Sequence, residues 1–158
     1  MRKKIAILFF VFLNISSFAQ NKEEKKLDSL KIELKKAKID TVKINILNEI
    51  CSLYFYNKPK IGINYSQRAL NLSEKIYWKK GMAIAHNHMG ICHWITQDNE
   101  LSMSHFQKAL ALYKEINDPK NISDNYNRIG TLYSQANKYS QALFCFNTAY
   151  KINSKIGN

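Results

Sequence analysis

Four histidines and one cysteine are the residues whose types and spacing best suit metal or proton chemistry. His88 and Cys92 lie four residues apart, so on a helix the two side chains would share one face and could hold a metal ion together. Two ligands are too few for a closed zinc site, and the sequence shows no third ligand near them. The remaining histidines are His86, His93 and His105. We therefore predict that the protein binds no metal and no cofactor, and we keep metal binding as an alternative.

Little else in the sequence points to catalysis. A catalytic site needs a nucleophile or an acid–base pair held in a defined arrangement. The sequence has no glycine-rich phosphate loop, no Cys-x-x-Cys pair and no nucleophile elbow, and its 12 acidic residues are scattered along 158 positions. We predict that the protein is not an enzyme. An enzyme or metal carrier centred on His88 and Cys92 is the alternative from another functional class.

A sequence motif with helical spacing recurs about every forty residues, and it indicates which elements would position these side chains. The motif occupies Asn64–Ile76, Ser104–Ile116 and Phe144–Ile156. In each copy an alanine follows two polar residues and precedes a large apolar one. Only five Gly and two Pro interrupt the chain, and alternating runs of β-branched residues are scarce. The predicted fold class is all-α.

Each repeat divides into two helical segments, within which apolar residues recur at spacings of three and four. The predicted helices are Thr41–Tyr56, Lys60–Tyr77, Gly81–Thr96, Asn99–Ile116, Asn121–Ala136 and Tyr139–Ile156. A single helix pair cannot bury both of its apolar faces. We therefore expect three pairs, over about residues 41–80, 81–120 and 121–158, to stack into an α-solenoid.

Small and large residues alternate in a way that predicts close packing within each pair. Two antiparallel helices approach closely only where one of them offers a small side chain. Phe106 and Phe146 are expected to fill the remaining space between the helices of their pairs. The predicted small positions are Cys51, Gly90 and Gly130 on the first helices and Ala69, Ala109 and Ala149 on the second helices.

The three repeats resemble the tetratricopeptide repeat. "YNRIGTLY" followed by "QALFCFNTA" matches its pattern of a large residue, Leu-Gly and Tyr, and then Ala, Phe and Ala. In "HNHMGICH" with "LSMSHFQKA", His86 and His93 occupy the aromatic places, and "LNEICSLY" with "GINYSQRA" is a degenerate copy. The resemblance covers Thr41 to Asn158. Compared with the usual length of about 34 residues, these repeats are long, with an extended second helix and no late proline. The resemblance implies a non-catalytic scaffold that binds proteins or peptides.

A charged segment, residues 20–40, precedes the repeats. Leu27, Leu30 and Leu34 recur at helical spacing between charged residues, which predicts an amphipathic helix over about residues 23–38 that caps the first repeat. A leading helix that ends in "DT" resembles the extracytoplasmic input region of bacterial signalling proteins built on these repeats. This resemblance implies an alternative function, namely the sensory part of a two-component histidine kinase or a transcriptional regulator whose output domain is absent here.

Residues 1–19 have the pattern of a secretory signal peptide. Three basic residues follow the initial methionine, an apolar run covers residues 5–13, and small residues precede a cleavage site after Ala19. We predict that the mature chain begins at Gln20 and is exported to the periplasm or the cell exterior. Because the apolar run is short for a membrane span, anchoring by residues 5–18 is the alternative.

The net charge of +12 raises the question of nucleic acid, because lysine neutralises phosphate. The 24 basic residues are spread along the whole chain, and an exported protein seldom meets nucleic acid. We therefore predict no nucleic-acid partner and interpret the lysines as solvated helix faces.

Three cysteines, Cys51, Cys92 and Cys145, form an odd set, so they cannot all pair with one another. Each falls at an apolar place in the helical pattern. Since free cysteine is among the most buried residue types, we predict buried free thiols.

Asparagine occupies the same place on the first helix of every pair, at Asn48, Asn87 and Asn127. In stacked pairs the first helix lines the concave face, so these amides would form a row that grips the backbone of an extended peptide. Chance recurrence of a common residue is the alternative.

The further predicted groove residues are Ser52, Phe55, Ile91, Trp94, Asp124, Arg128, Thr131 and Gln135. Phe55 and Trp94 would supply apolar contact, although Trp94 could instead pack against the neighbouring repeat. The predicted partner is a protein or peptide segment.

The last repeat stops where the second repeat leads into a third, because "SKIGN" aligns with "KEIND". Solenoids normally shield the apolar face of a terminal repeat with a polar helix. We predict either that the chain is part of a longer protein or that a partner, including a second copy of the chain, covers the open face of the last pair.

Overall fold

The structure, a computed structural model, describes residues 22–157. The predicted signal peptide and its cleavage site after Ala19 lie outside the described residues. The chain divides into two compact units, residues 1–36 and residues 37–158, and each is described by itself. Among the described residues, no helix is both long enough and apolar enough to cross a membrane.

The described part of the first unit is a single helix over residues 22–36. Within it, Ser29 Oγ donates a hydrogen bond of 3.3 Å to Glu33 Oε1 one turn later, a pair of the kind that supports an exposed helix. The helix expected over residues 23–38 is therefore present and ends two residues early. Its role as a cap for the first repeat stays a prediction.

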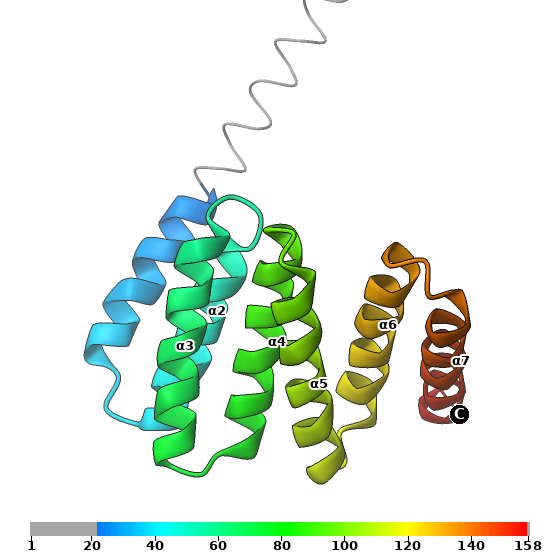
Figure 1. The fold of residues 1–158 in the computed structure, drawn as a ribbon. Coiled ribbons are helices and arrows are strands. Elements are labelled where there is room, and N and C mark those ends of the chain that lie inside the picture. Colours follow the sequence, from blue (N-terminus) through cyan, green and yellow to red (C-terminus); the bar gives the residue numbers. More distant parts are fainter. Residues whose placement is uncertain (1–21, 158) are drawn as a thin grey trace, which may run out of the picture. The chain divides into compact units, whose positions relative to one another are not determined.

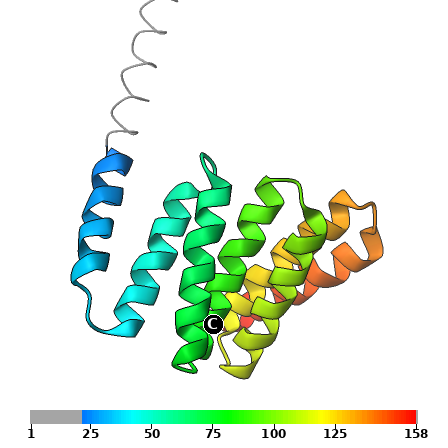
Figure 2. The ribbon, with the colours of Figure 1, turned by 60° about the vertical axis from the view of Figure 1, so that its left-hand side comes forward.

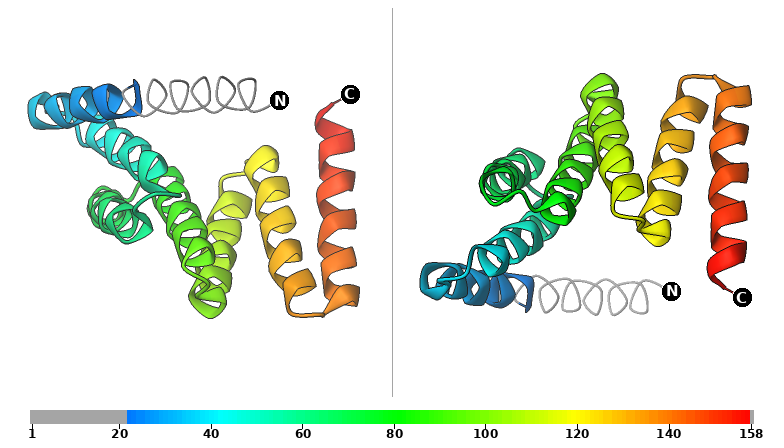
Figure 3. Two further views of the ribbon diagram at one scale, coloured as in Figure 1. Left: turned by 90° about the horizontal axis from the view of Figure 1, so that it is seen from above. Right: turned by 90° about the horizontal axis from the view of Figure 1, so that it is seen from below.

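The described residues of the second unit form six helices joined by short turns (Figure 1). They are α2 (Asp40–Tyr54), α3 (Pro59–Lys75), α4 (Lys79–Ile95), α5 (Asn99–Glu115), α6 (Pro119–Gln135) and α7 (Tyr139–Ile156). Each helix packs against the next, and α2 also contacts α4. Figures 2 and 3 show the same succession from other directions, with the colours running in chain order from α2 in cyan to α7 in red. The described residues contain no strand, and the predicted all-α solenoid of three helix hairpins is confirmed.

One kind of turn joins the helices from α3 onward. Tyr77, Gln97, Asn117 and Asn137 all adopt a positive φ, between 52 and 63°. The residue after each of them donates its backbone N–H to the carbonyl five residues earlier, which satisfies the orphan carbonyls at the end of the preceding helix. Glycine usually occupies this left-handed position. Because the chain uses tyrosine, glutamine and asparagine there, no glycine in the sequence marks these turns.

The regular turns correct two expectations. In the second and third pairs the helices are nearly equal, with 17 residues in α4, α5 and α6 and 18 in α7, so the second helix is clearly the longer one only in the first pair, where α3 has 17 residues and α2 has 15. The first helices α4 and α6 begin at Lys79 and Pro119, two residues before their predicted starts. As a result, the joins between hairpins are no longer than the turns within them. The six helices otherwise agree with the predicted ranges to within two residues.

The predicted alternation of small and large residues is confirmed in the second and third hairpins. A β-carbon added at Gly90 would lie 2.6 Å from Phe106 Cδ1, and one added at Gly130 would lie 2.8 Å from Phe146 Cε1. Real β-carbons do not come this close to other atoms, so each phenylalanine packs where the facing glycine has no side chain. The predicted small residues of the second helices, Ala69, Ala109 and Ala149, are buried as well.

All three cysteines are buried with free thiols, as the sequence predicts. Cys145 of α7 packs in an apolar cluster with Ile129 and Leu132 of α6. Cys51 of α2 and Cys92 of α4 face each other instead, with their Sγ atoms 4.0 Å apart.

Candidate functional site

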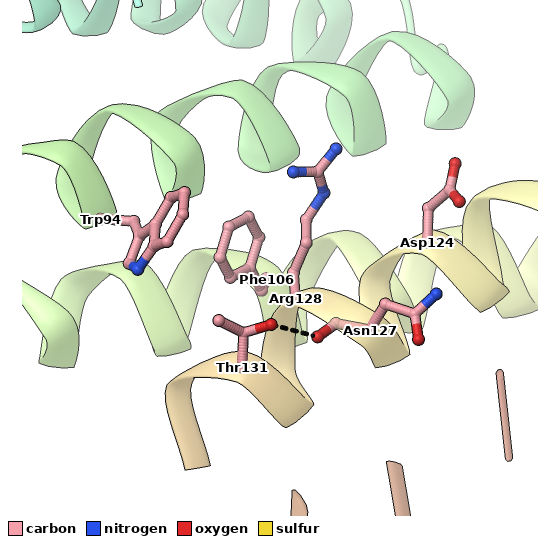
Figure 4. A pocket seen from close by; sticks show the side chains of 6 residues that line it. All are labelled: Trp94, Phe106, Asp124, Asn127, Arg128 and Thr131. Atoms are coloured by element: carbon pink, nitrogen blue, oxygen red, sulfur yellow. Dashed lines mark hydrogen bonds between the residues drawn. The ribbon is translucent and has the colours of Figure 1, made fainter. Parts of the chain in front are cut away.

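Five of the predicted groove residues line one pocket between α4 and α6 (Figure 4). The pocket has a volume of about 310 Å³, at the lower end of the range for ligand sites. Its lining residues are Trp94, Phe106, Asp124, Asn127, Arg128 and Thr131. We call it the Trp94 pocket.

Three helices position this lining. Trp94 stands in the last turn of α4, and Phe106 lies near the middle of α5. The other four residues belong to α6 and follow one another at spacings of three, one and three, which places them on one face of that helix. The pocket therefore depends on the way in which the second and third hairpins stack.

A hydrogen bond joins the two sides of the pocket at one end. Trp94 Nε1 donates to Gln135 Oε1 of α6 at 3.1 Å. The bond fixes one edge of the indole, while 37% of the Trp94 surface remains exposed. Trp94 therefore contacts the neighbouring repeat and also presents an aromatic surface to the pocket.

Arg128 lies against the aromatic floor of the pocket. Its Cζ is 5.8 Å from the centroid of the Phe106 ring, within the range of a cation–π contact, and Phe106 is only 2% exposed. The buried Arg128 Nε has no hydrogen-bond partner. In Figure 4 the guanidinium lies between Phe106 and Asp124. Within the described part of the chain, neither Arg128 nor Asp124 forms a salt bridge.

The unpaired state of these two charges is a finding that the sequence does not suggest. Asp124 and Arg128 are four residues apart on a helix, a spacing at which opposite charges usually pair. Here the arginine packs over Phe106 instead. A guanidinium and a carboxylate thus remain available to a ligand, above an apolar floor.

The remaining polar groups of the pocket suit a peptide. Thr131 Oγ1 donates a hydrogen bond of 3.0 Å to the Asn127 backbone carbonyl, which leaves the exposed Asn127 amide side chain as donor and acceptor. A planar guanidinium such as that of Arg128 can bind a carboxylate through two hydrogen bonds. The combination fits an apolar side chain flanked by a carboxylate and a peptide backbone.

The three asparagines of the predicted row differ in exposure. Asn127 is exposed in the pocket, Asn87 is half-buried, and Asn48 is 4% exposed. Within the described residues, neither polar atom of the Asn48 side chain has a hydrogen-bond partner, and the same holds for Asn87 Oδ1. A buried polar group without a partner costs on the order of 1–3 kcal/mol. The helices α2 and α4 are in direct contact, whereas α4 and α6 flank an open pocket.

The other predicted groove residues lie outside the pocket lining. Ser52 Oγ donates to a backbone carbonyl of its own helix at 2.7 Å. Phe55 is half-buried and meets the ring of His88 edge-on, with the ring centroids 5.1 Å apart. Ile91 is 7% exposed and packs with Phe106 in an apolar cluster, so it is a core residue next to the pocket.

Three histidines meet between α4 and α5. His86 Nδ1 lies 3.0 Å from His105 Nδ1, and the rings of His93 and His105 stack with centroids 5.4 Å apart. Burial, together with the nearby charge of Lys108, lowers the pKa of His86 to about 4. Burial also lowers the pKa of His105 to about 4, with smaller effects from the neighbouring histidines. His86 and His105 are therefore uncharged at neutral pH.

The described residues contain no group of three or more His, Cys, Asp or Glu that could hold a metal ion. His86 and His93 occupy the places where the third hairpin has tyrosines, in agreement with their aromatic positions in the repeat. The sequence alone indicates no role for His105, because its contacts with both rings form only when α5 packs on α4.

Phe106 is the pocket residue that sequence reasoning missed, because its position in the repeat marks it as a core residue. The structure agrees that it is buried, yet its ring also floors the pocket beneath Arg128. A basic residue on the groove face of one hairpin, next to the phenylalanine of the preceding hairpin, is the pattern that could have indicated it.

Comparisons with known proteins agree with this geometry. Residues 81–155 match the family model described as tetratricopeptide repeat. The crystal structure of BtubC (BKLC) from P. vanneervenii aligns with a TM-score of 0.77 and 17% identity. The alignment covers 87% of this chain and 59% of that one, so this chain spans less than two thirds of that protein. The TPR domain of Arabidopsis FLU aligns with a TM-score of 0.68 and 14% identity, over 74% of this chain and 99% of that one. No curated protein matches the sequence.

The structural likenesses show the fold, and the family model identifies the repeats of the second and third hairpins. Domains of this family generally mediate protein–protein interactions and are typically not catalytic. The spacing of small and large residues, the stacked hairpins and the family match agree. Residues 81–155 are tetratricopeptide repeats, and the helix hairpins of the second unit share the fold of known domains built from such repeats.

Proposed function

We propose that the protein is a non-catalytic scaffold that binds a peptide or protein segment in the groove lined by the first helices, with the Trp94 pocket as the principal contact. One observation carries this proposal: predicted groove residues from α4 and α6 converge on a single pocket whose cation and anion are unpaired. An apolar side chain of the partner would lie against Trp94 and Phe106, and an adjacent carboxylate would pair with Arg128. The Asn127 amide would bond the partner's backbone.

Tryptophan fluorescence tests this proposal, because the chain has only two tryptophans. The variant Trp78→Phe leaves Trp94 as the sole indole. Tryptophan-free peptides selected from a displayed random library against the purified protein are then titrated into this variant. We expect the selected peptides to combine a large apolar residue with Asp or Glu and to shift the Trp94 emission.

Two arginine variants separate a pocket contact from a general charge effect. Arg128→Met keeps the apolar stem over Phe106 and removes the charge. Arg68→Met removes a comparable arginine on α3, which is exposed and lies over the ring of Tyr65. We expect Arg128→Met to weaken binding of acidic peptides at least about tenfold, or about 1.4 kcal/mol, and Arg68→Met to leave it unchanged. Peptides that bind both Arg128→Met and Trp94→Ala as tightly as the parent protein would overturn the proposal.

The asparagine row is part of the same proposal and has its own test. Single changes of Asn87 and Asn127 to Ala should each weaken a selected peptide by about 1 kcal/mol if the peptide extends along α4 and α6, whereas Asn48→Ala should leave binding unchanged, because Asn48 is only 4% exposed. Circular dichroism checks that each variant is folded. Weakening by Asn127→Ala alone would confine the contact to the Trp94 pocket.

Two features of the sequence support further proposals about where and in what form the protein acts. The pattern of residues 1–19 supports export, and a mature N-terminus at Gln20 is the expected result of sequencing the protein from envelope fractions. Retention of residues 5–18 in the membrane fraction would favour the anchored alternative.

A sensory role in a longer signalling protein rests on the sequence resemblance, and reading the gene beyond the codon for Asn158 tests it.

The outer face of α7 supports self-association as a second mode of binding. Leu143, Phe144 and Tyr150 are 61%, 65% and 73% exposed, which is unusual for large apolar side chains. Two copies could bury these faces against each other. Sedimentation at increasing concentrations should then show a larger species that Phe144→Lys removes. A size that is independent of concentration would contradict self-association.

A further inference from the structure

A pair of thiols lies in the interior where the first two hairpins meet. The Sγ atoms of Cys51 on α2 and Cys92 on α4 are 4.0 Å apart, and both residues are 0% exposed. A third helix closes over them at Gly62 of α3. A β-carbon added there would lie 3.0 Å from Cys92 Sγ and 3.4 Å from Cys51 Sγ.

The local geometry allows the two sulfurs to approach each other. A disulfide needs an S–S distance of about 2.05 Å, so the sulfurs must come closer by about 2 Å. Rotation of a cysteine side chain about its Cα–Cβ bond moves its sulfur by a distance of this order. Because Gly62 has no side chain, this position of α3 places no side chain against either sulfur.

The same packing disfavours other oxidised forms of these cysteines. A glutathione group on either sulfur would have to displace the backbone of α3 at Gly62, since both thiols are fully buried. An internal disulfide adds no atoms and removes the two thiol hydrogens. It is therefore the oxidised form that the closed interior can accommodate.

In the closed fold, the contact between the thiols also makes their ionisation unequal. Their shared hydrogen bond lowers the pKa of Cys51 and raises that of Cys92, so Cys51 is the first of the pair to ionise. The thiolate is the nucleophile in thiol–disulfide exchange. By contrast, burial raises the pKa of Cys145, which has no second thiol in contact among the described residues.

We propose that Cys51 and Cys92 form a disulfide that joins α2 to α4 when the protein folds in the presence of a small-molecule or protein disulfide. One thiolate of the pair attacks the oxidant and expels one thiolate, and the second thiolate of the pair then attacks the sulfur of the first and expels the other. The protein loses two protons and two electrons, and the oxidant becomes two thiols. The mixed intermediate forms while the hairpins are still open, and their closure favours the internal bond.

This modification goes beyond peptide binding and does not depend on it. The bond would close a loop between residues 41 positions apart and would restrict the unfolded chain. It would also fix α2 to α4, the helices that carry Asn48 and Asn87. Export would supply an oxidising compartment, but the chemistry itself can be tested in a defined buffer.

The test uses the full chain from Gln20, refolded from urea in a mixture of reduced and oxidised glutathione, so that burial does not block access. We expect the intact mass to fall by the mass of two hydrogens and tryptic mapping to link the peptides that contain Cys51 and Cys92. The oxidised protein should melt at a higher temperature than the reduced protein, and added dithiothreitol should reverse the difference.

Cys145→Ser is the matched control, because it leaves only the proposed pair and should give the same linkage and the same rise in melting temperature. Cys51→Ala and Cys92→Ala should each lose both effects. Glutathione adducts, a linkage that involves Cys145, intermolecular dimers, or two free thiols at Cys51 and Cys92 after refolding would each overturn the proposal. Peptide binding by the same samples, measured separately, shows whether the groove functions in either case.

Discussion

The second and third hairpins each contain the same kind of packing contact, a phenylalanine against a glycine, but the phenylalanine is buried to a different degree in each. Phe106 fits against Gly90 and Phe146 fits against Gly130 in the same register of the repeat. Phe106 is 2% exposed, because α6 packs on the outer side of α5. Phe146 on α7 is 38% exposed, since no described helix follows. Equivalent glycine–phenylalanine pairs therefore contribute differently to the free energy of unfolding, according to the position of the hairpin in the stack.

The two hairpins also differ in the residues around this contact. His86 and His93 of the second hairpin stand where the third hairpin has Tyr126 and Tyr133. The second hairpin thus carries imidazole rings at places where its neighbour carries phenol rings. One repeat pattern can therefore hold either a histidine cluster or tyrosine rings without a change of fold.

Truncation of the two phenylalanines should give the largest difference between the hairpins. We expect Phe106→Ala to lower the free energy of unfolding by about 3–4 kcal/mol, because it removes a fully buried ring, and Phe146→Ala to lower it by about half as much. Urea denaturation followed by circular dichroism measures both. Equal losses would mean that the outer face of α7 is covered in solution.

Alanine at the two glycines should sharpen the same contrast. At Gly90 the new β-carbon would press on the enclosed ring of Phe106, so overpacking of about 1–3 kcal/mol should outweigh the helix-propensity gain of about 1 kcal/mol. At Gly130 the partly exposed Phe146 can turn outward, and we expect a change within about 0.5 kcal/mol of zero. Chemical denaturation of both variants under one set of conditions is the measurement. A larger loss at Gly130 would contradict the explanation.

Acid should destabilise the second hairpin through its histidines. The pKa values of His86 and His105 are lowered in the folded state from 6.5 to about 4, so below pH 6.5 the unfolded chain binds protons more readily than the folded chain. Their contribution to stability is full above about pH 6.5 and is lost as the pH falls towards 4. We expect the melting temperature to drop over this interval.

The variant His86→Tyr, which copies Tyr126 of the third hairpin, should reduce this acid-induced drop. Thermal melts of the parent and the variant at pH 7, 6, 5 and about 4 provide the comparison. An unchanged pH dependence in the variant would assign the acid sensitivity to other groups.

Changes to the N-terminal caps of the helices should have the smallest effect on the free energy of unfolding. Asp98 and Asp118 cap α5 and α6 by accepting hydrogen bonds from Leu101 N and Asn121 N at 3.2 and 3.1 Å, whereas Lys138 gives α7 no side-chain cap. Lys138→Asp should raise the free energy of unfolding by about 0.5–1 kcal/mol. Asp118→Ala, the reciprocal change, should lower it by a similar amount. Loss of stability in Lys138→Asp would show that this turn cannot provide a cap.

Much of the fold was predictable because helix periodicity is a local property of the sequence. Spacings of three and four placed all six helices of the second unit to within two residues, and small residues opposite phenylalanines predicted the close contacts. The turns were less predictable, since their left-handed residues are Tyr77, Gln97, Asn117 and Asn137 and not glycines. The starts of α4 and α6 were therefore placed two residues late.

The candidate site was predictable only in part. Repeat register alone singled out Trp94, Asn127 and Arg128, which meet in one pocket. Register could not show that Asn48 would be buried, or that Arg128 would turn from Asp124 to Phe106. These outcomes depend on how far apart neighbouring hairpins lie, and that distance is fixed by many side chains at once.

The helices, their pairing and the repeat type follow from the sequence alone, because each depends on the periodicity and size of residues close together in the chain. Tertiary packing then sets which polar groups remain open to a partner and which are enclosed. It brought Cys51 to Cys92 and His86 to His105. The physical reason is that contacts between helices depend on the packing of surfaces that the chain order does not specify.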